Sequence, residues 1–417
     1  MSELDRINEL IHQAAEKARM ETSDEPEPQY VGELTWPVKV EIGQGLEGAI
    51  AGSTKVGYVN GAKGWLIYRG FNIFDLAEKS NYEETAYLLL FGRLPKEAEL
   101  HDFKRRVGEY RVVPADVIRI LQTLPTARAH PMTALQTATA ALGALDPTTD
   151  AADIATKREH SIKLIAQLGT LIGAIAAIRQ GRAPLDPDPS LSHAADILRM
   201  MTGKAPSPMD ERIMDIGLIL HADHGCNAST FTCMVVNSSL SDMYSTVAAG
   251  IASLKGPLHG GANEHVLYML DEIGSPDNVK DWYQKAAAQK RKVMGFGHRV
   301  YRAYDPRARI LGPLSHLIAE AHPEIRPMWE TAATLEQVVI EHLGKEKKIF
   351  PNVDYWSGIV YKALGIETKM FTPIFAASRV AGWTARVLEY LENNRIFRPR
   401  VTYTGPIKLD YVPLSER

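Results

Sequence analysis

Apolar residues recur at the three- and four-residue spacing of a helix through most of this chain. The chain shows no series of alternating strands and helices, so the pattern favours an all-α fold over an α/β fold. A short amphipathic helix is expected at residues 3–20. Longer helical segments are predicted at Tyr82–Phe91, Pro131–Leu142, Ser161–Arg179, Ile213–Leu220, Asn227–Val236, Asn263–Ile273 and Pro373–Glu392.

Strand-like patterns occur only near the N-terminus. Residues Val38–Ile42 alternate between apolar and polar positions, which predicts a strand. Val56–Gly61 and Trp65–Tyr68 are joined by a glycine-containing turn and predict a small N-terminal β hairpin. The polar, proline-bearing segment Ser23–Pro28 has the composition of a linker, so the folded part is expected to begin near Leu34.

The most apolar stretch of the chain is Leu164–Ile178. It is interrupted by Gln167, has a basic residue at each end and is shorter than a membrane span, so it is interpreted as a buried helix. Gly169 and Gly173 indicate close packing against other helices, either in the core of one subunit or against a second subunit.

The last predicted helix has clear end signals. Thr372 is a candidate N-cap, and Pro373 fits the first helical position, where a missing N–H costs nothing. The helix is expected to end near Asn393 and Asn394.

The 47 basic and 50 acidic side chains of the 417 residues nearly balance, so no net field attracts nucleic acid or a membrane surface. The two cysteines, Cys226 and Cys233, are too few for a disulfide framework and favour a reducing, cytoplasmic location. The acidic residues Glu3, Asp5 and Glu9 argue against a signal or transit peptide.

Three later segments each set one ionisable side chain among glycines or at the edge of a loop: Gly256–Gly261, Gly295–Arg299 and Pro351–Gly358. Any of these side chains alone could be a structural, hydrogen-bonded residue. Together they supply two imidazoles and a carboxylate, a set that suits proton abstraction and carbonyl polarisation without a metal. The side chains are His259, His298 and Asp354.

Two further groups of residues have open interpretations. Residues 290–309 carry seven basic side chains and the single acid Asp305, which fits either an anion site or a solvated basic helix face. His221 and His224 are spaced to share one helix face. They could be structural, bind substrate or hold a metal such as zinc, although neither cysteine completes a recognised metal spacing with them.

The motifs Gly-Pro-Leu-His-Gly-Gly, Gly-Phe-Gly-His-Arg-Val-Tyr followed by Asp-Pro-Arg, and Pro-Asn-Val-Asp occur here in this order. They resemble the three active-site segments of the citrate synthase family. The resemblance runs from about Leu34 to the end and includes Leu66–Gly70, Phe91–Pro95, His130–Met132 and Ser378–Arg379.

The resemblance implies a two-lobed, multihelical fold with three parts: a leader helix and linker at 1–33, a large helical domain at 34–261 and 367–417, and a small helical domain at 262–366. It also implies a homodimer in which helices 131–142 and 161–179 meet a second copy, with no nucleic acid or membrane partner. The implied activity is that of an acyltransferase of the citrate (Si)-synthase type. It condenses acetyl-CoA with oxaloacetate and water, without a tightly bound cofactor or metal, to give citrate and CoA. The alternative within the family is 2-methylcitrate synthase, which uses propionyl-CoA.

Residue roles follow from the matching motifs. Asp354 would be the base, His259 would bond the thioester oxygen, and His298 would polarise the oxaloacetate carbonyl. The oxaloacetate carboxylates would be held by His224, Arg307, Arg379 and Arg398, the last from the partner subunit and rivalled by Arg400. The CoA site would contain Arg302, Lys292, Gly295 and Gly297.

This chain departs from the family pattern at two positions. Gly225 and then Cys226 follow His224, where many members carry an acid. Arg386 stands where bacterial relatives commonly have a histidine. From the sequence, the partner that orients His224 and the effect of Arg386 are both unknown.

Overall fold

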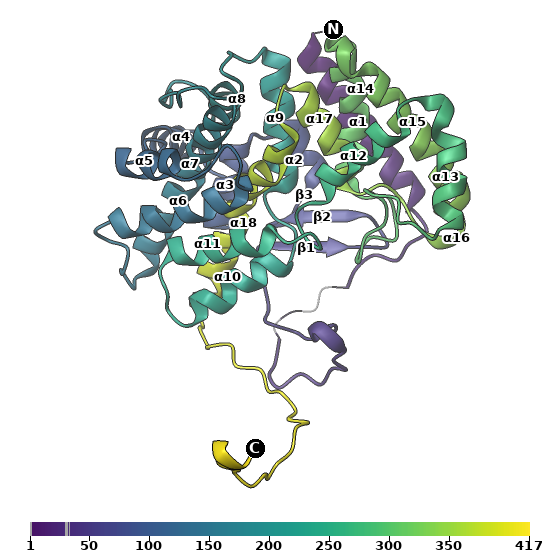
Figure 1. The fold of residues 1–417 in the computed structure, drawn as a ribbon. Helices are drawn as coiled ribbons and strands as arrows, with labels where there is room; N and C mark the ends of the chain where they lie inside the picture. The colour runs from purple at the N-terminus through teal and green to yellow at the C-terminus, as the bar shows by residue number, and fades with distance from the viewer. Residues whose placement is uncertain (1, 30–31, 33) are drawn as a thin grey trace.

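The computed structural model describes residues 2–29, 32 and 34–417 and is mostly helical (Figure 1). Residues 1, 30, 31 and 33 of the predicted leader lie outside the described residues. The α-helices are α1 Glu3–Glu21, α2 Ile73–Lys79, α3 Tyr82–Phe91, α4 Glu97–Tyr110, α5 Ala115–Thr123, α6 Pro131–Leu145, α7 Ile154–Arg179, α8 His193–Thr202, α9 Pro208–His221, α10 Ala228–Ser238, α11 Met243–Leu254, α12 Ala262–Ile273, α13 Val279–Ala288, α14 Pro306–Ala321, α15 Arg326–Val339, α16 Lys345–Lys347, α17 Val353–Ala363 and α18 Phe371–Leu391.

Helix α18 is the central element of the core. It packs against α3, α7, α9, α10 and α11, and its residues from Phe371 to Leu388 are buried. It ends at Leu391, as predicted, but it begins at Phe371 with Met370 as N-cap, so the N-cap prediction for Thr372 is wrong. The Thr372 hydroxyl instead lies 3.2 Å from the carbonyl oxygen of Gly260 and 3.1 Å from the Glu264 carboxylate. This tertiary contact takes the side chain away from a local cap.

Helix α7 is a buried core helix, as the sequence predicts. With 26 residues the helix is longer than the apolar stretch Leu164–Ile178 and could cross a bilayer by its length. However, 83% of its most apolar window is buried inside the fold. Its two glycines face α8 of the same chain. A Cβ at Gly173 would lie 2.5 Å from Met200, and one at Gly169 would lie 2.9 Å from His193. The close packing therefore needs no second subunit.

Three short strands form one antiparallel sheet in the order β1-β2-β3: Gly57–Asn60, Trp65–Tyr68 and Phe71–Asn72. The predicted hairpin is confirmed, with β3 as an added strand. Residues 38–42, all of them described, form no strand, so that prediction is wrong. Val40 and Ile42 are 41% and 58% exposed, and alternation without a pairing partner or a core face does not make a strand.

Helix α1 belongs to the folded body, which corrects the expectation that folding begins near Leu34. Ile7, Ile11 and Ala14 lie at helical spacing and are buried in the main hydrophobic core. The helix packs on α14, α2 and α9. The N-terminal helix therefore lies beside a helix encoded some 300 residues later (Figure 1).

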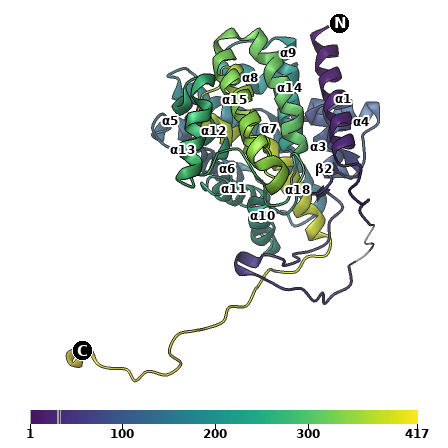
Figure 2. The same cartoon turned by 90° about the vertical axis from the view of Figure 1, so that its right-hand side faces the viewer.

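Helices α12 to α17 lie together on one side of the molecule, next to α1, while α3 to α8, α10 and α11 lie on the other side (Figure 1). After α18 the chain leaves this body as an exposed tail that runs to the C-terminus (Figure 2). Many of the predicted site residues lie in loops, and the loop between α13 and α14 alone carries Lys292, Gly295, Gly297, His298 and Arg302.

Candidate active site

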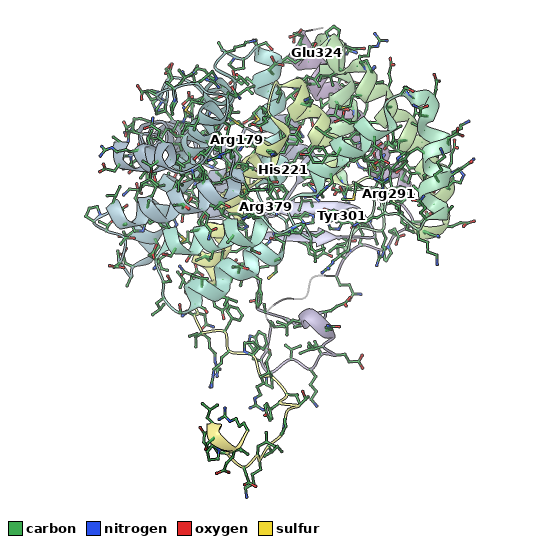
Figure 3. All side chains as sticks on the ribbon, in the orientation of Figure 1. Arg179, His221, Arg291, Tyr301, Glu324 and Arg379 are labelled. Atoms are coloured by element: carbon green, nitrogen blue, oxygen red, sulfur yellow. The ribbon has the colours of Figure 1, made fainter. Side chains whose placement is uncertain are left out.

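The three predicted chemical side chains come from separate loops and helix starts. His259 lies in the turn between α11 and α12, His298 lies in the loop between α13 and α14, and Asp354 is the second residue of α17. All three are partly buried, so a ligand can reach them. Figure 3 shows Tyr301 and Arg379, neighbours of these loops, near the middle of the molecule.

Backbone hydrogen bonds join the His298 loop to the start of α17. The Gly297 amide donates to the Phe350 carbonyl at 2.9 Å, and the Asn352 amide donates to the Gly295 carbonyl at 2.8 Å. Gly295 and Gly297 have φ angles of 79° and 82°, which glycine adopts without strain. Residues 295–298 and 350–354 are therefore held side by side.

The neighbours of His298 determine which ring nitrogen carries its proton. Nδ1 accepts hydrogen bonds from the backbone amides of Val300 and Tyr301 at 3.0 and 3.2 Å. Burial lowers the pKa of His298 to about 4. A neutral imidazole whose Nδ1 accepts carries its proton on Nε2, so Nε2–H is free to donate to a ligand.

His259 has the opposite tautomer. Its Nε2 accepts from the backbone amide of Ser229 at 3.2 Å and lies 2.9 Å from the Ser229 hydroxyl. Ser229 is buried in the first turn of α10, where backbone amides lack partners within the helix. Burial, together with the charge of Arg379, lowers the pKa of His259 to about 4. The neutral ring therefore keeps its proton on Nδ1.

Asp354 has an electrostatic environment that suits a base. Burial raises the pKa of its carboxyl to about 6, against the opposing charges of Arg307 and Arg379. Its backbone amide is capped by the side chain of Asn352 at 3.0 Å. A carboxylate with a pKa near neutrality removes a proton more effectively than an ordinary one and is still ionised at neutral pH.

The predicted oxaloacetate-binding residues divide into a buried group and an exposed one. Arg307 forms a fork-like pair with Asp305 at 2.7 and 3.0 Å, and both side chains are buried. Arg379 is buried, donates from Nε to the His221 carbonyl, and has no partner for Nη2 among the described residues. Burial lowers the pKa of Arg379 to about 10, so it stays charged at neutral pH.

His224 lies beside His298, with ring centroids 5.1 Å apart, and its Nε2 is 3.2 Å from the Tyr301 hydroxyl. The Arg307 guanidinium lies over the Tyr301 ring, 6.0 Å from its centroid. Burial, with the Arg307 charge, lowers the pKa of His224 well below its usual value. The partner of His224 that the sequence left unknown is therefore Tyr301.

His221 does not join His224 on one helix face. It is the last residue of α9, its Nδ1 is bonded to the Gly217 carbonyl at 2.7 Å, and its ring packs against Phe375. His224 lies beyond the end of that helix. Within the described part of the chain, no group of three or more His, Cys, Asp or Glu side chains is placed to hold a metal ion. The arrangement of His221 fits the structural interpretation.

The basic stretch 290–309 is partly paired. Arg291 pairs with Glu272, Arg307 with Asp305, and Arg309 with Glu21. The exposed side chains of Lys292, Arg299 and Arg302 form no ion pair within the described residues. Lys292 lines a surface pocket of about 320 Å³ together with His265, Tyr268, Met269, Glu272, Arg291 and Met294.

The two predicted CoA-site glycines differ in their surroundings. A Cβ at Gly295 would lie 2.8 Å from both Tyr355 and Val266, so Gly295 serves the packing of α12 against α17. No described atom lies within 4 Å of the Cβ position at Gly297, so one face of its backbone is open. Arg398 and Arg400 are both exposed in the tail that follows α18.

Sequence reasoning missed four side chains around the site: Ser229, Tyr301, Asp305 and Asn352. Each is buried or partly buried and contacts a predicted residue. Asp305 and Asn352 lie inside the motifs and could have been found as caps, because both precede a helix. Tyr301 also lies inside a motif, but neither it nor Ser229 carries a capping signal.

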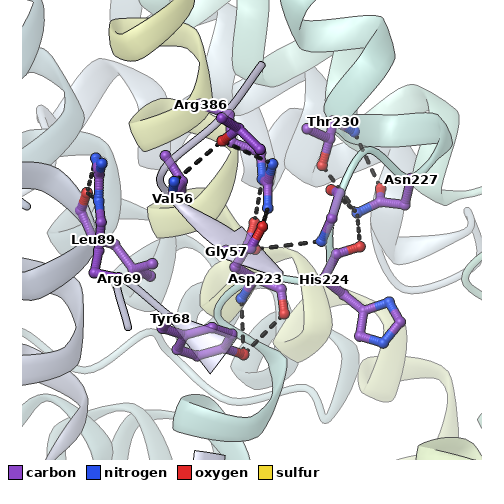
Figure 4. A network of polar contacts seen from close by, with 12 residues as sticks. Val56, Gly57, Tyr68, Arg69, Leu89, Asp223, His224, Asn227, Thr230 and Arg386 are labelled. Carbon is purple, nitrogen blue, oxygen red and sulfur yellow. Dashed lines mark hydrogen bonds and ion pairs between the residues drawn. The ribbon is translucent and has the colours of Figure 1, made fainter. Parts of the chain in front are cut away.

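The charged residue Arg386 forms a network with the loop that carries His224 (Figure 4). Its guanidinium makes two hydrogen bonds to the carboxylate of Asp223, at 2.8 and 2.7 Å. Tyr68 of β2 bonds the backbone of the same aspartate. Arg386 and Gly225, the two positions at which this chain differs from the family pattern, are therefore close together in space.

Comparisons with known proteins identify a family for this chain. The family model "Citrate synthase, C-terminal domain" matches residues 45–400. A citrate synthase of Deinococcus radiodurans is 42% identical over 90% of this chain and 99% of its own length. A 2-methylcitrate synthase of Shewanella oneidensis is 37% identical over 90% of this chain and 98% of its own length.

Solved structures lead to the same family. The crystal structure of citrate synthase from Pyrobaculum aerophilum superposes with a TM-score of 0.85, 42% identity and coverage of 92% of this chain and 100% of that one. The structure of the Thermoplasma acidophilum citrate synthase in a ternary complex with carboxymethyl coenzyme A and oxaloacetate superposes with a TM-score of 0.86. It is 36% identical, and the match covers 91% of this chain and 100% of that one. This chain belongs to the citrate synthase family.

Proposed function

We propose that this protein condenses acetyl-CoA with oxaloacetate and water to give citrate and CoA. The observation that carries the proposal is the pair of complementary histidine tautomers together with a carboxyl group whose pKa is raised. His259 presents Nδ1–H and His298 presents Nε2–H, because their other ring nitrogens are occupied by backbone amides. Asp354, whose pKa burial raises to about 6, supplies the base.

The first step is removal of a proton from the acetyl methyl group by the Asp354 carboxylate. The electron pair of the broken C–H bond moves onto the thioester oxygen, which receives a hydrogen bond from Nδ1–H of His259. A donor aimed at the developing oxyanion and a positioned base each contribute roughly 10²- to 10⁴-fold to such a step.

In the second step the enol carbon attacks the keto carbon of oxaloacetate. Nε2–H of His298 polarises that carbonyl and stabilises the alkoxide that forms, which takes up a proton to become the hydroxyl group of the product. His224, Arg307 and Arg379 bind the two carboxylates, and the unpartnered Nη2 of buried Arg379 is available to one of them. Water then cleaves the citryl thioester, and the CoA thiol takes up a proton as it leaves.

The pocket lined by Lys292 supports a site for the nucleotide part of CoA. It combines the exposed ammonium of Lys292 with the aromatic side chains of His265 and Tyr268, which suits a phosphate next to a base. Arg302 is exposed in the same loop as His298 and is placed in this proposal near the CoA phosphates. The open face of Gly297 allows a ligand to approach the backbone.

We also propose two lobes, 34–261 with 367–417 and 262–366, that close over the substrates. This division puts His224, His259 and Arg379 on one lobe and His298, Arg307 and Asp354 on the other. Closure would assemble the site and exclude water, which strengthens the polar contacts and protects the enol.

A homodimer fits the exposed surfaces. The tail beyond α18 carries exposed apolar side chains, with Val401 and Ile407 at 93% and 95% exposure, and it contains Arg398. Helix α6 exposes the small residues Thr133, Thr137, Ala140 and Ala144 along one stripe, a surface that permits close helix packing. We propose that both surfaces contact a second copy and that Arg398 enters its site. A monomer in sedimentation at micromolar concentration would contradict this.

The experiment that tests the function is release of free thiol from acetyl-CoA in the presence and absence of oxaloacetate. Oxaloacetate-dependent release is expected, and no release would reject the proposal. The second candidate is 2-methylcitrate synthase, which the Shewanella relative's name favours. One methylene in a pocket is worth about 1–3 kcal/mol, so kcat/KM for acetyl-CoA and propionyl-CoA must be compared directly. A higher value for propionyl-CoA would favour the second candidate.

A cytoplasmic location is part of the same proposal. Both cysteines are free, and the Cys233 thiol is buried. Free thiols fit a reducing compartment.

A further inference from the structure

The pair formed by Arg386 and Asp223 is one of the most buried ion pairs described in this chain, with side chains 4% and 0% exposed. The guanidinium meets the carboxylate as a fork: Nε donates to Oδ1 at 2.8 Å and Nη2 donates to Oδ2 at 2.7 Å. Two parallel charge-assisted bonds fix direction as well as distance. Helix α18 therefore holds the side chain of Asp223 in one orientation (Figure 4).

The backbone around Asp223 is held from other sides. The Tyr68 hydroxyl accepts from the Asp223 amide at 3.1 Å and donates to its carbonyl at 2.8 Å. The Gly382 amide of α18 donates to the Ala222 carbonyl at 3.0 Å. A Cβ at Gly382 would lie 2.4 Å from that carbonyl oxygen, so only glycine allows this approach. The loop is therefore in close contact with α18 at Ala222.

His224 is the next residue in the chain. Its ring lies against His298 and Tyr301, and Gly225 after it has a φ of 63°, so the chain turns sharply at this point. The Gly225 amide also donates to the Asp223 carboxylate at 3.3 Å. One carboxylate thus connects Arg386 to the backbone on both sides of His224. The Asp223 carboxylate therefore lies between Arg386 and the backbone that carries His224.

We propose that Arg386, acting through Asp223, is a positioning residue for oxaloacetate: it sets the imidazole of His224 against His298 and Tyr301. The inference rests on the proposed function, because it assumes that His224 binds oxaloacetate. Arg386 itself faces the sheet, where Nη2 also lies 3.3 Å from the Gly57 carbonyl and Nη1 lies 3.3 Å from the Thr54 hydroxyl. It touches neither substrate in this account.

Arginine is suited to this role in a way that lysine is not. Lysine keeps the positive charge but offers a single point contact in place of a planar fork. Arg386→Lys therefore preserves the charge balance with Asp223 and removes the fixed direction. Arg386→Met removes both. The two variants separate the orienting role from the neutralising role.

The test measures kcat, KM for oxaloacetate and KM for acetyl-CoA in Arg386→Lys, together with thermal stability. KM for oxaloacetate should rise roughly 3- to 30-fold, the range of couplings passed through packed networks. KM for acetyl-CoA should stay within about twofold of the wild-type value, because this network does not reach the Lys292 pocket. Arg386→Met should show a larger rise in KM for oxaloacetate than Arg386→Lys does.

The matched control is Arg111→Lys. Arg111 is also a buried arginine, paired with Asp196 at 3.2 Å, with side chains 2% and 0% exposed. It lies among α4, α7 and α8, which carry none of the predicted site residues. Its substitution should lower thermal stability and leave both KM values unchanged. A purely structural role for Arg386 would give the same result as this control.

A second measurement asks whether the effect passes through His224. In a His224→Ala background, Arg386→Lys should no longer raise KM for oxaloacetate, because the side chain that it positions is absent. An equal rise in both backgrounds, or no rise in either, would overturn the inference. Should Arg386→Met fail to fold, Arg386→Lys carries the test alone. A wild-type protein that releases no thiol would reject the proposed function, and this inference with it.

Discussion

The side-chain amide of Asn352 donates a hydrogen bond to the carbonyl oxygen of Gly297 at 3.0 Å. The carbonyl oxygen of the same side chain accepts from the Asp354 amide, so one asparagine connects the loop of His298 to the helix start of Asp354. Residues more than 50 positions apart in the chain are thereby held as one unit. The relative placement of the proposed base and the proposed carbonyl donor depends on this residue.

Asn352→Ala should therefore affect both stability and catalysis. Loss of an N-cap and of a buried hydrogen bond costs about 1–3 kcal/mol of unfolding free energy. kcat should fall as well, because the Asp354 and His298 segments lose their link. Asn81→Ala is the control, since Asn81 caps α3 by accepting from Glu84 at 3.0 Å and lies outside the predicted site. Equal loss of kcat in both variants, measured beside urea denaturation, would argue against a catalytic link.

Asp354→Asn should abolish most turnover and leave oxaloacetate binding intact. The amide has the size of the carboxyl but cannot take up a proton, so kcat should fall by roughly 10²- to 10⁴-fold. Calorimetric titration with oxaloacetate should give a dissociation constant close to that of the wild type, because the carboxylate clamp is formed by other residues. Turnover near the wild-type rate would disprove the assignment of the base.

The pH dependence of kcat/KM for acetyl-CoA should show an acidic limb near pH 6. Burial raises the pKa of Asp354 to about 6, and only the ionised carboxylate is a base, so activity is lost as pH falls through that value. At one pH unit below the pKa about a tenth of the base remains ionised. His259 and His298, whose pKa burial lowers to about 4, stay neutral across this range and do not produce the limb. A profile that is flat from pH 7 to pH 5 contradicts this assignment.

Ile11→Ala should destabilise the protein although it lies before the stretch that matches the family model. Ile11 is fully buried where α1 packs on its neighbouring helices. Truncation of a buried isoleucine to alanine costs about 2–5 kcal/mol of unfolding free energy. Met20→Ala on the same helix is the control, since Met20 is 75% exposed and its loss should change stability by no more than about 0.5 kcal/mol. Thermal denaturation of both variants checks this, and equal stability would show that α1 does not belong to the cooperative core.

The helical fold class and part of the helices could be predicted because their signals are local, whereas helices such as α4, α8 and α14 were not predicted. The period of apolar residues identified α3, α6, α10, α12 and α18 within a few residues, and the glycine turn identified the hairpin. Helix α7 was identified too, but it begins at Ile154, seven residues before the predicted start at Ser161. The prediction of a strand at Val38–Ile42 was wrong because a strand needs a pairing partner, and a local sequence pattern does not show whether one exists. The prediction of Thr372 as an N-cap was wrong for a related reason, because its hydroxyl donates a hydrogen bond to the distant Gly260 carbonyl instead.

The predicted site residues were found where glycines and charge mark a loop, as at His259 and His298. The residues that orient them were not, because Ser229 and Tyr301 are ordinary side chains whose role arises only when distant segments meet. The effect of Arg386 could not be foreseen either. Its partner Asp223 lies 163 positions away, and only the fold brings the two together.

The central claim is that carbon–carbon bond formation follows deprotonation of the acetyl methyl by Asp354. It is tested most directly with acetyl-CoA labelled with ¹³C in the methyl group, by following the label with NMR while oxaloacetate is present. The wild-type protein should form citrate labelled in one methylene in equal amount to the CoA released, and Asp354→Asn should form almost none. Release of CoA with the label appearing in acetate would instead indicate simple thioester hydrolysis and contradict the account.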